Sequence, residues 1–233
     1  MKHMSTVESL LGLTAPPVAI GFFDAPPLGV NKWTGGTVPA GCAFWKEAQN
    51  GQTFYTVPSD HFECAVGAYT HAISLPVVRE NELMDTVGFM VEANYIAMDE
   101  VPGIPKLDVS PHYIAYGPAD TCGFTPAIVI VAAEPSSCMH LYEAIIAAGG
   151  GPLIPSLGRP GCAVVPLVSN TGAASLSFGC AGNRTFSGLP DSQMYICIPG
   201  NLWHATPEKV ADVCQANALM RAHYSAKQDT LSV

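Results

Sequence analysis

Ala127-Ile-Val-Ile-Val-Ala-Ala133 is the longest apolar run in the chain, and it is bounded by Pro126 and Pro135. Its length suits a buried β-strand and falls far short of the roughly 20 apolar residues that a membrane-spanning helix needs. Immediately downstream, Pro135-Ser-Ser-Cys138 opens a predicted helix that continues to Ala148 and ends at Gly149-Gly-Gly151. A buried strand that leads into a helix is therefore the starting point for the fold.

Similar patterns recur on both sides of this run. The further predicted helices are Cys42 to Ala48, Ala65 to Ile73, Glu80 to Glu100 and Glu208 to His223. The further predicted strands are Val18 to Phe23, Thr53 to Val57, His112 to Tyr116, Cys162 to Val165, Ala173 to Phe178 and Gln193 to Ile198. Because these elements alternate without a regular βαβ order, we expect an α+β or mixed α/β fold. Residues 1–233 should form a single compact domain or two tightly packed subdomains, with a seam near residues 102–111.

Charge and composition restrict the classes of partner. Charged residues make up 12% of the chain and hydrophobic residues 48%, whereas roughly a quarter of an average protein is charged. A surface with so little charge favours a homo-oligomer, in which neighbouring subunits cover part of it. The net charge is −9 and no basic run occurs, so nucleic acid and anionic membrane surfaces are poor partner candidates.

Eight cysteines need an explanation. The N-terminus lacks the charged start, apolar stretch and cleavage site of a secretion signal, so we expect a cytoplasmic location. In a reducing compartment, cysteines serve metal binding, redox chemistry, catalysis or core packing rather than disulfides. No CxxC pair occurs, which argues against a zinc ribbon and c-type haem attachment. Any metal site must therefore combine cysteines from distant segments.

One cysteine lies in an unusual local setting, the stretch Ser177-Phe-Gly-Cys-Ala-Gly-Asn-Arg184. Glycines on both sides of Cys180 allow the backbone to approach a ligand closely, and Arg184 adds a fixed positive charge. Cys42 and Cys64 fall near predicted helix N-termini, where the helix dipole favours a thiolate and other anions. These three positions are therefore candidate ligands.

The chain resembles the domain-of-unknown-function family 169 of bacteria and archaea across nearly its whole length. The matching stretches are Pro16-Pro-Val-Ala-Ile20, Cys42-Ala-Phe-Trp-Lys-Glu-Ala48 with Gly51, His61-Phe-Glu-Cys64 with Gly67, Pro126-Ala-Ile-Val-Ile130, Glu134-Pro135, Pro160-Gly-Cys162, and Gly179-Cys-Ala-Gly-Asn-Arg184 with Met194 and Ile198-Pro199. The resemblance implies a shared set of cysteines at positions 42, 64, 162 and 180, and it supplies no established activity. Where members of the family often have proline after the second of these cysteines, this chain has Ala65.

Four dispersed thiolates match the ligand number of an iron–sulfur cluster such as [4Fe–4S], or of a structural zinc ion. Single ligands from glycine-rich turns and helix starts, with Arg184 nearby, favour the cluster. We therefore expect a cofactor-binding redox protein or enzyme with Cys42, Cys64, Cys162 and Cys180 as metal ligands, and an electron-transfer partner. If it is an enzyme, an oxidoreductase or a Lewis-acid lyase fits best, with His61 and Arg184 as catalytic residues; His61 could also replace one cysteine as ligand.

Several alternatives remain open at this point. The four cysteines could be ordinary small core residues, or the protein could bind haem or another small ligand in an apolar pocket. A metal-free oligomeric assembly protein and an enzyme with Cys64 as nucleophile are also consistent with the sequence. Two of the other four cysteines, Cys197 and Cys214, lie in an apolar strand and an apolar helix stripe, so we expect them to serve packing.

Overall fold

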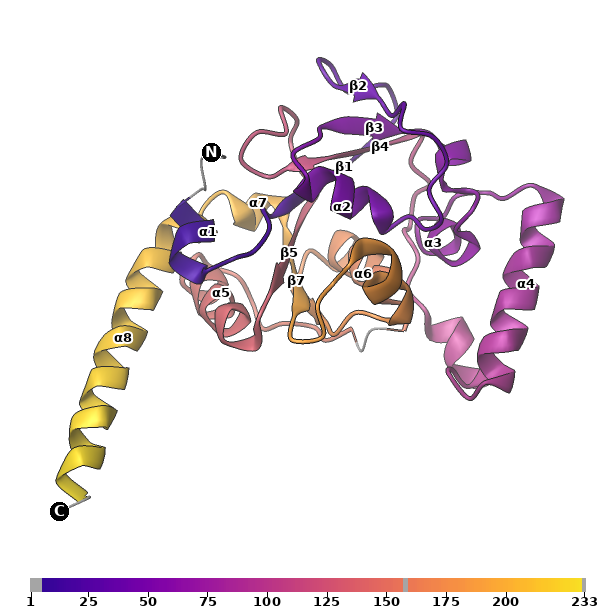
Figure 1. Cartoon of the computed structure of the whole chain (residues 1–233). Helices are drawn as coiled ribbons and strands as arrows, with labels where there is room; N and C mark the ends of the chain where they lie inside the picture. The colour runs from indigo at the N-terminus through magenta and orange to yellow at the C-terminus, as the bar shows by residue number, and fades with distance from the viewer. Residues whose placement is uncertain (1–5, 157–158, 232–233) are drawn as a thin grey trace.

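The strand that opened the sequence analysis lies at the centre of the molecule. The computed structural model describes residues 6–156 and 159–231, and in them a seven-stranded sheet has the order β2-β3-β4-β1-β5-β7-β6 (Figure 1). The strands are β1 (Val18–Phe23), β2 (Asn31–Lys32), β3 (Phe54–Thr56), β4 (Tyr113–Pro118), β5 (Ile128–Ala133), β6 (Ser175–Ser177) and β7 (Met194–Pro199). Neighbouring strands pair antiparallel except β2 and β3, which are parallel.

Helices surround the sheet. The α-helices are α1 (Thr6–Leu11), α2 (Ala43–Gln49), α3 (Ala65–Thr70), α4 (Val77–Glu92), α5 (Pro135–Ala147), α6 (Val164–Thr171), α7 (Gly200–Trp203) and α8 (Thr206–Leu231). Four short segments complete the helical structure: the 3₁₀ turns η1 (Pro58–His61), η2 (Met98–Gly103) and η3 (Gly161–Ala163), and the π-type turn η4 (Asn183–Ser187).

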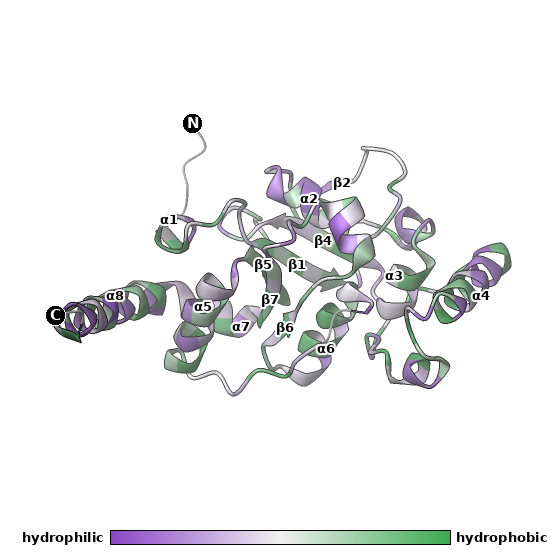
Figure 2. Cartoon of the chain, turned by 60° about the horizontal axis from the view of Figure 1, so that its bottom comes forward, coloured by the Kyte–Doolittle hydropathy of each residue, from purple (hydrophilic) through white to green (hydrophobic). Residues whose placement is uncertain are grey.

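Strand β5 explains why two cores form. All six of its residues are buried, and successive side chains point to opposite faces of the sheet. Ile128 and Ile130 join a core beneath α2, α3 and α6, whereas Val129 and Val131 join a second core beneath α1, α5, α7 and α8. Figure 2 shows green, apolar residues along β5 and β7 between these two helical layers. A strand covered on both faces needs apolar residues throughout, which accounts for the unbroken run.

The predicted fold class is confirmed, because a mixed sheet with helices on both faces makes one compact α+β domain. The seam expected near residues 102–111 falls between η2 and β4 and stays a prediction. Two helices project from opposite ends of the molecule, α4 and the long α8 (Figure 1). In the described ranges, no helix is both long and apolar enough to span a membrane.

The strand predicted at Cys162 to Val165 is wrong. These residues form η3 and the start of α6, in which Val164, Val165 and Val168 are buried on one side. Pro166 is tolerated there because the N–H groups of a first helical turn have no partner within the helix. The β-branched residues thus pack as a helix face, and α6 ends at Gly172 in the left-handed conformation, with φ of 66°.

The predicted helix Glu80 to Glu100 is also shorter than expected. Helix α4 ends at Glu92, and Asn94 adopts a left-handed φ of 53° that reverses the chain. Asparagine tolerates this conformation better than most residues with a side chain. The chain then re-forms a short helical turn only at η2.

Candidate functional site

Cys42, Cys64, Cys162 and Cys180, here called the cysteine quartet, each lie at a turn or at the start of a helix. Cys42 is the N-cap of α2 and Cys64 the N-cap of α3. Cys162 is the middle residue of η3, and Cys180 lies three residues before η4. Three of them pack against the core beneath α2 and α6. Four segments far apart in sequence thus present a thiol on the same side of the sheet.

Cys42, Cys64 and Cys162 have raised pKa values to which other cysteines of the quartet contribute. Burial, reinforced by the thiols of Cys64 and Cys180, raises the pKa of Cys42 to about 12. Burial also raises the pKa of Cys162, with further contributions from Cys64, Cys180 and Cys42, and that of Cys64, to which Cys180 contributes. Because such interactions act over short distances, the structure brings the quartet together in one region.

The remaining cysteines lie outside this group. Burial alone raises the pKa of Cys138, to about 12, and of Cys214. Burial likewise raises the pKa of Cys197 within β7, against a hydrogen bond to its own strand. None of these shifts includes a contribution from the quartet. All eight cysteines are free thiols.

Each sulfur of the quartet has a hydrogen-bonding neighbour. The Gly67 N–H donates to Cys64 Sγ at 3.3 Å. The Thr70 hydroxyl lies 3.5 Å from Cys162 Sγ, and the nearer carbonyl of Gly67, at 2.9 Å, competes for its single hydrogen. Donors of this kind stabilise a thiolate, and hydrogen bonds to sulfur tune a bound metal centre. Cys42 Sγ lies 4.0 Å from the carbonyl oxygen of Gly182. The site therefore contains donors that point at sulfur.

Asn183 connects two members of the quartet. Its Oδ1 accepts from the backbone N–H of Cys180 at 3.1 Å and from the Cys180 thiol at 3.4 Å. A hydrogen bond from the same side chain lowers the pKa of Cys42 and so opposes the effect of burial. Asn183 is buried, and a Cβ on Gly161 would overlap its Oδ1. The amide is thus held in place between the two thiols.

Aromatic rings close the site towards the core. The pKa of Tyr116 is raised by burial and then by Cys162, Cys42 and Cys64. Burial raises the pKa of Tyr195 as well, and Cys42 and Cys180 contribute. Phe44 stacks on Tyr116 with ring centroids 5.5 Å apart, and Trp45 meets Tyr195 edge-on at 5.2 Å. Such walls exclude water, which influences the potential of a bound redox centre.

His61 is a buried, neutral histidine. Burial, with a smaller effect of His71, lowers its pKa to about 3. Its Nε2 lies 2.8 Å from the Thr56 hydroxyl, which itself donates to the carbonyl of Ile114 at 3.1 Å. Because the bond to Ile114 uses the only hydroxyl hydrogen of Thr56, His61 Nε2 must donate its hydrogen to the Thr56 oxygen. The ring also packs 5.0 Å from Phe44. These contacts give His61 an ordering role beside the quartet, and its catalytic role stays a prediction.

His71 is a site neighbour that the sequence analysis did not single out. Its Nδ1 lies 2.9 Å from the carbonyl of Gly67, which can only accept, so Nδ1 carries the hydrogen. The other nitrogen, Nε2, is buried and has no hydrogen-bond partner in the described part of the chain. Thr70 links the His71 ring to Cys162 through contacts of 3.1 and 3.5 Å. An isolated histidine in an apolar helix carries no sequence signal for this position.

Arg184 stabilises its own loop. The guanidinium donates to the carbonyls of Pro190 at 2.7 Å and Phe178 at 2.8 Å, and it lies 3.4 Å from Asp191. Its positive charge lowers the pKa of Tyr195, a wall of the site. Arg184 thus fixes the segment that carries Cys180, and its proposed catalytic role is not addressed by these contacts.

Metal coordination places a further constraint on the site. In residues 6–156 and 159–231, no three histidine, cysteine, aspartate or glutamate side chains are arranged so that they could hold a metal ion. The quartet as positioned is therefore not a preformed site for one ion.

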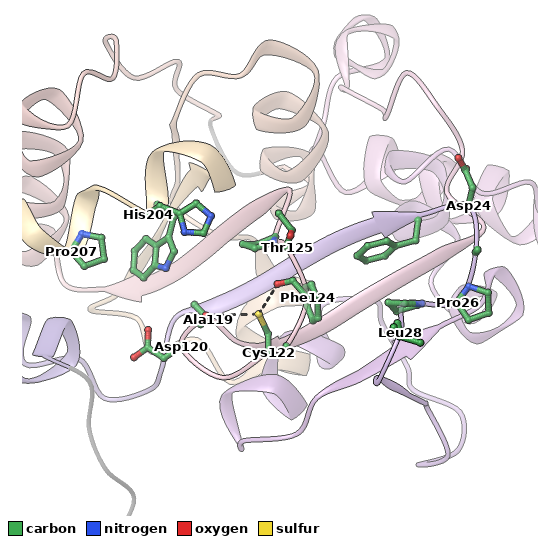
Figure 3. A pocket seen from close by; sticks show the side chains of 16 residues that line it. Asp24, Pro26, Leu28, Ala119, Asp120, Cys122, Phe124, Thr125, His204 and Pro207 are labelled. Carbon is green, nitrogen blue, oxygen red and sulfur yellow. Dashed lines mark hydrogen bonds between the residues drawn. The ribbon is translucent and has the colours of Figure 1, made fainter.

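A separate hollow of about 840 Å³ has no residue of the quartet in its lining, and Figure 3 shows it from close by. The loop after β1 lines it on one side, and the β4–β5 loop and the start of α8 line it on the others. Cys122 lies in its wall and donates its thiol to the carbonyl of Phe124 at 3.2 Å. Phe124 packs edge-on against Phe23 at 6.0 Å and sits above Gly21, whose notional Cβ would lie 3.1 Å from it. The lining of this hollow is mixed, because Asp24, Asp120 and His204 join apolar residues such as Phe23 and Trp203.

Comparisons with known proteins give a family and no activity. The "Uncharacterized protein MJ0308" of Methanocaldococcus jannaschii is 28% identical over 127 residues, which cover 52% of this chain and 50% of that protein. The alignment thus spans about half of the relative's length. No solved structure matches the chain. The model of the family DUF169, described as "Uncharacterised ArCR", matches residues 6–209. Because this match includes most of the chain, and all four cysteines of the quartet, the protein belongs to the DUF169 family.

Proposed function

We propose that the cysteine quartet holds an iron–sulfur cluster of the [4Fe–4S] type and that the protein is a redox protein or enzyme. The observation that carries this proposal is the convergence of four segments. Cys42 Sγ lies 4.0 Å from the carbonyl oxygen of Gly182 in the Cys180 segment, and the Thr70 hydroxyl of the helix capped by Cys64 lies 3.5 Å from Cys162 Sγ. A Cβ on Gly161, next to Cys162, would lie 3.2 Å from the backbone nitrogen of Cys180. Four cysteine thiolates are the usual ligand set of such a cluster.

The separation of the ligands differs between a cluster and a single ion. A zinc ion binds thiolates at about 2.3 Å in a tetrahedron, which brings the four sulfurs to within about 4 Å of one another. A cluster places irons and sulfides between its cysteine ligands, so the ligands lie farther apart. The quartet is gathered in one region, yet among the described residues no triplet could hold one ion. A cluster accepts a wider separation between its cysteine ligands than a single zinc ion does.

The surroundings also suit an anionic cluster. The Gly67 N–H donates to Cys64 Sγ, and the Thr70 hydroxyl lies within reach of Cys162 Sγ. No carboxylate contributes to the raised pKa values of Cys42, Cys64 and Cys162. A cluster held by four cysteines has no open iron, so electron transfer is the role that this ligand set supports best. We further propose a cytoplasmic location, since eight free thiols suit a reducing compartment, and a homo-oligomer, since only 12% of the residues are charged.

The experiment is ligand-by-ligand replacement. The protein and its variants Cys42→Ser, Cys64→Ser, Cys162→Ser and Cys180→Ser are reconstituted anaerobically with iron and sulfide. The wild type should show the broad visible absorption of sulfide-to-iron charge transfer, and each variant should lose at least half of it. Circular dichroism checks that each variant is folded.

Cys197→Ala is the matched control. Cys197 is fully buried in the same core, but its raised pKa has no contribution from the quartet. Its replacement should leave the visible spectrum unchanged. Full absorption in all four quartet variants, or an equal loss in the control, contradicts the proposal.

A further inference from the structure

Helix α4 and the turn η2 form an arm, residues 77–103, at the end of the molecule opposite α8 (Figure 1). Neither element contains a single buried residue. The 16 residues of α4 pack chiefly on α3, through one side of the helix. A helix that buries so little gains little stability from packing, so its outer face is available to another molecule.

The outer face is unusually apolar for a helix in that position. Val77, Val78, Met84 and Phe89 of α4 are each about 70% exposed, and Met98 of η2 is 60% exposed. A helix bathed in water normally carries polar residues on that side. A cluster of large exposed apolar side chains is typical of a surface at which another protein binds.

Negative charge surrounds these apolar residues. The arm contains six exposed carboxylates and one basic residue, Arg79. The carboxylates are Glu80, Glu82, Asp85, Glu92, Asp99 and Glu100. If two copies of the chain met arm to arm about a two-fold axis, these like charges would face each other and repel. The charge therefore favours a different protein with a basic surface.

The arm touches two loops of the quartet. Arg79 forms an ion pair with Glu63, the residue before Cys64. At the far end of α4, the Tyr95 hydroxyl accepts a hydrogen bond of 3.1 Å from the N–H of Ala181, the residue after Cys180. A protein bound to the outer face of the arm would therefore be separated from the loops of two proposed cluster ligands by the arm itself.

We propose that the arm is the docking surface for an electron-transfer protein whose basic surface surrounds an apolar centre. This inference rests on the proposed function, because it gives the cluster a partner. The acidic residues steer the partner and the apolar side chains are covered on contact.

The experiment uses a basic cytochrome c as the probe. The loaded protein is reduced with dithionite, freed of excess reductant, and mixed with oxidised cytochrome c in a stopped-flow instrument at several ionic strengths. One electron passes from the cluster to the haem iron. The triple variant Glu80→Gln/Asp85→Asn/Glu92→Gln should lower the second-order rate constant about tenfold at low salt and flatten its salt dependence.

The control removes the same charge from α8. Glu208→Gln/Asp212→Asn/Asp229→Asn alters three exposed carboxylates at the other end of the molecule, and it should change the rate constant less than twofold. Equal effects in both triple variants would show that only net charge matters, and an unchanged rate in the arm variant would remove the arm from the encounter. Either result overturns the docking proposal.

Two further results separate this inference from the proposed function. A protein that shows no chromophore reducible by dithionite contradicts the cluster and the docking surface with it. A normal chromophore with an arm variant that reacts at the wild-type rate contradicts the docking surface alone. A dimer that Phe89→Ser converts to a monomer would identify a second copy as the occupant of the arm, and would contradict a basic partner.

Discussion

Asn183 shows how a single residue can organise the site. Its amide accepts from the N–H and thiol of Cys180 and hydrogen-bonds to Cys42, so one side chain sets the positions of two candidate ligands. Asn183 belongs to the Gly179–Arg184 stretch, yet nothing in that stretch distinguishes it from a turn asparagine. Contacts between residues 42 and 183 exist only in the folded chain.

Replacing Asn183 by aspartate should weaken retention of the bound metal. Asp keeps the shape and the acceptor of Asn, but it loses the N–H donor and adds a negative charge beside thiolates. We expect iron to be lost to a chelator at least ten times faster, since residues that support metal ligands typically contribute this much. Release is followed by absorbance of the chelated iron. Asn183→Asp protein that releases iron at the wild-type rate would show that the amide does not support the ligands.

The lowered pKa of His61 predicts that the free energy of unfolding depends on pH. Folding lowers its pKa from 6.5 to about 3 by burial, so the folded protein resists protonation of a group that the unfolded chain protonates readily. The stabilisation is complete above pH 6.5 and is lost progressively as the pH falls towards 3. His71, also buried with a lowered pKa, adds to the same trend.

The measurement is the free energy of unfolding in urea between pH 7.5 and 4. His61→Gln should show a weaker decline than the wild type over this range, while His223→Gln, on the exposed end of α8, should follow the wild-type curve. Identical pH profiles for wild type and His61→Gln would mean that His61 titrates normally in the folded protein.

At the scale of elements, two of the four candidate ligands lie at helix starts, and α3 is the clearest case. Cys64 caps this helix and accepts from the N–H of Gly67. The sequence predicted the helix and the cysteine at its start, because both follow from local pattern. It could not predict the glycine contact, in which a Cβ at position 67 would lie only 2.8 Å from Cys64 Sγ.

Gly67→Ala should therefore separate helix stability from metal binding. Alanine favours a helix over glycine by up to about 1 kcal/mol, but its Cβ would displace the sulfur of Cys64. We expect at least a threefold loss of bound iron, measured after anaerobic reconstitution, while the helix itself remains formed.

Gly88→Ala provides the matched control in α4. A Cβ at this position meets nothing within 4 Å, so the substitution should raise the thermal unfolding midpoint by a few degrees and leave iron binding unchanged. Equal iron contents in the Gly67→Ala and Gly88→Ala proteins would show that Cys64 does not need the space above Gly67.

Elements were predictable where the local pattern is unambiguous. Val18–Phe23 and Ile128–Ala133 are strands because continuous apolar runs suit a sheet covered on both faces. The strand predicted at Cys162 to Val165 was wrong because the same β-branched residues serve equally well as one face of a helix. Packing of that face against the sheet favours the helix over the strand. Helix α4 ended early because Asn94 turns the chain, which no periodicity reveals.

For the whole molecule, the class of the fold followed from the sequence and its topology did not. The strand order β2-β3-β4-β1-β5-β7-β6 places β1 between β4 and β5. Both of these neighbours follow β1 by about a hundred residues, and local sequence patterns do not encode pairing over such a separation. The four cysteine positions came from the family resemblance. That four such distant segments lie on one side of the sheet is a property of this topology alone.

The central claim is that these four thiols hold an iron–sulfur cluster, and iron and sulfide analysis of the anaerobically purified protein tests it most directly. We expect about four irons and four acid-labile sulfides per chain in the wild type. The Cys180→Ser protein should lose these irons and sulfides. A folded, colourless protein that contains neither iron nor sulfide, and that takes up neither on anaerobic reconstitution, would contradict the claim.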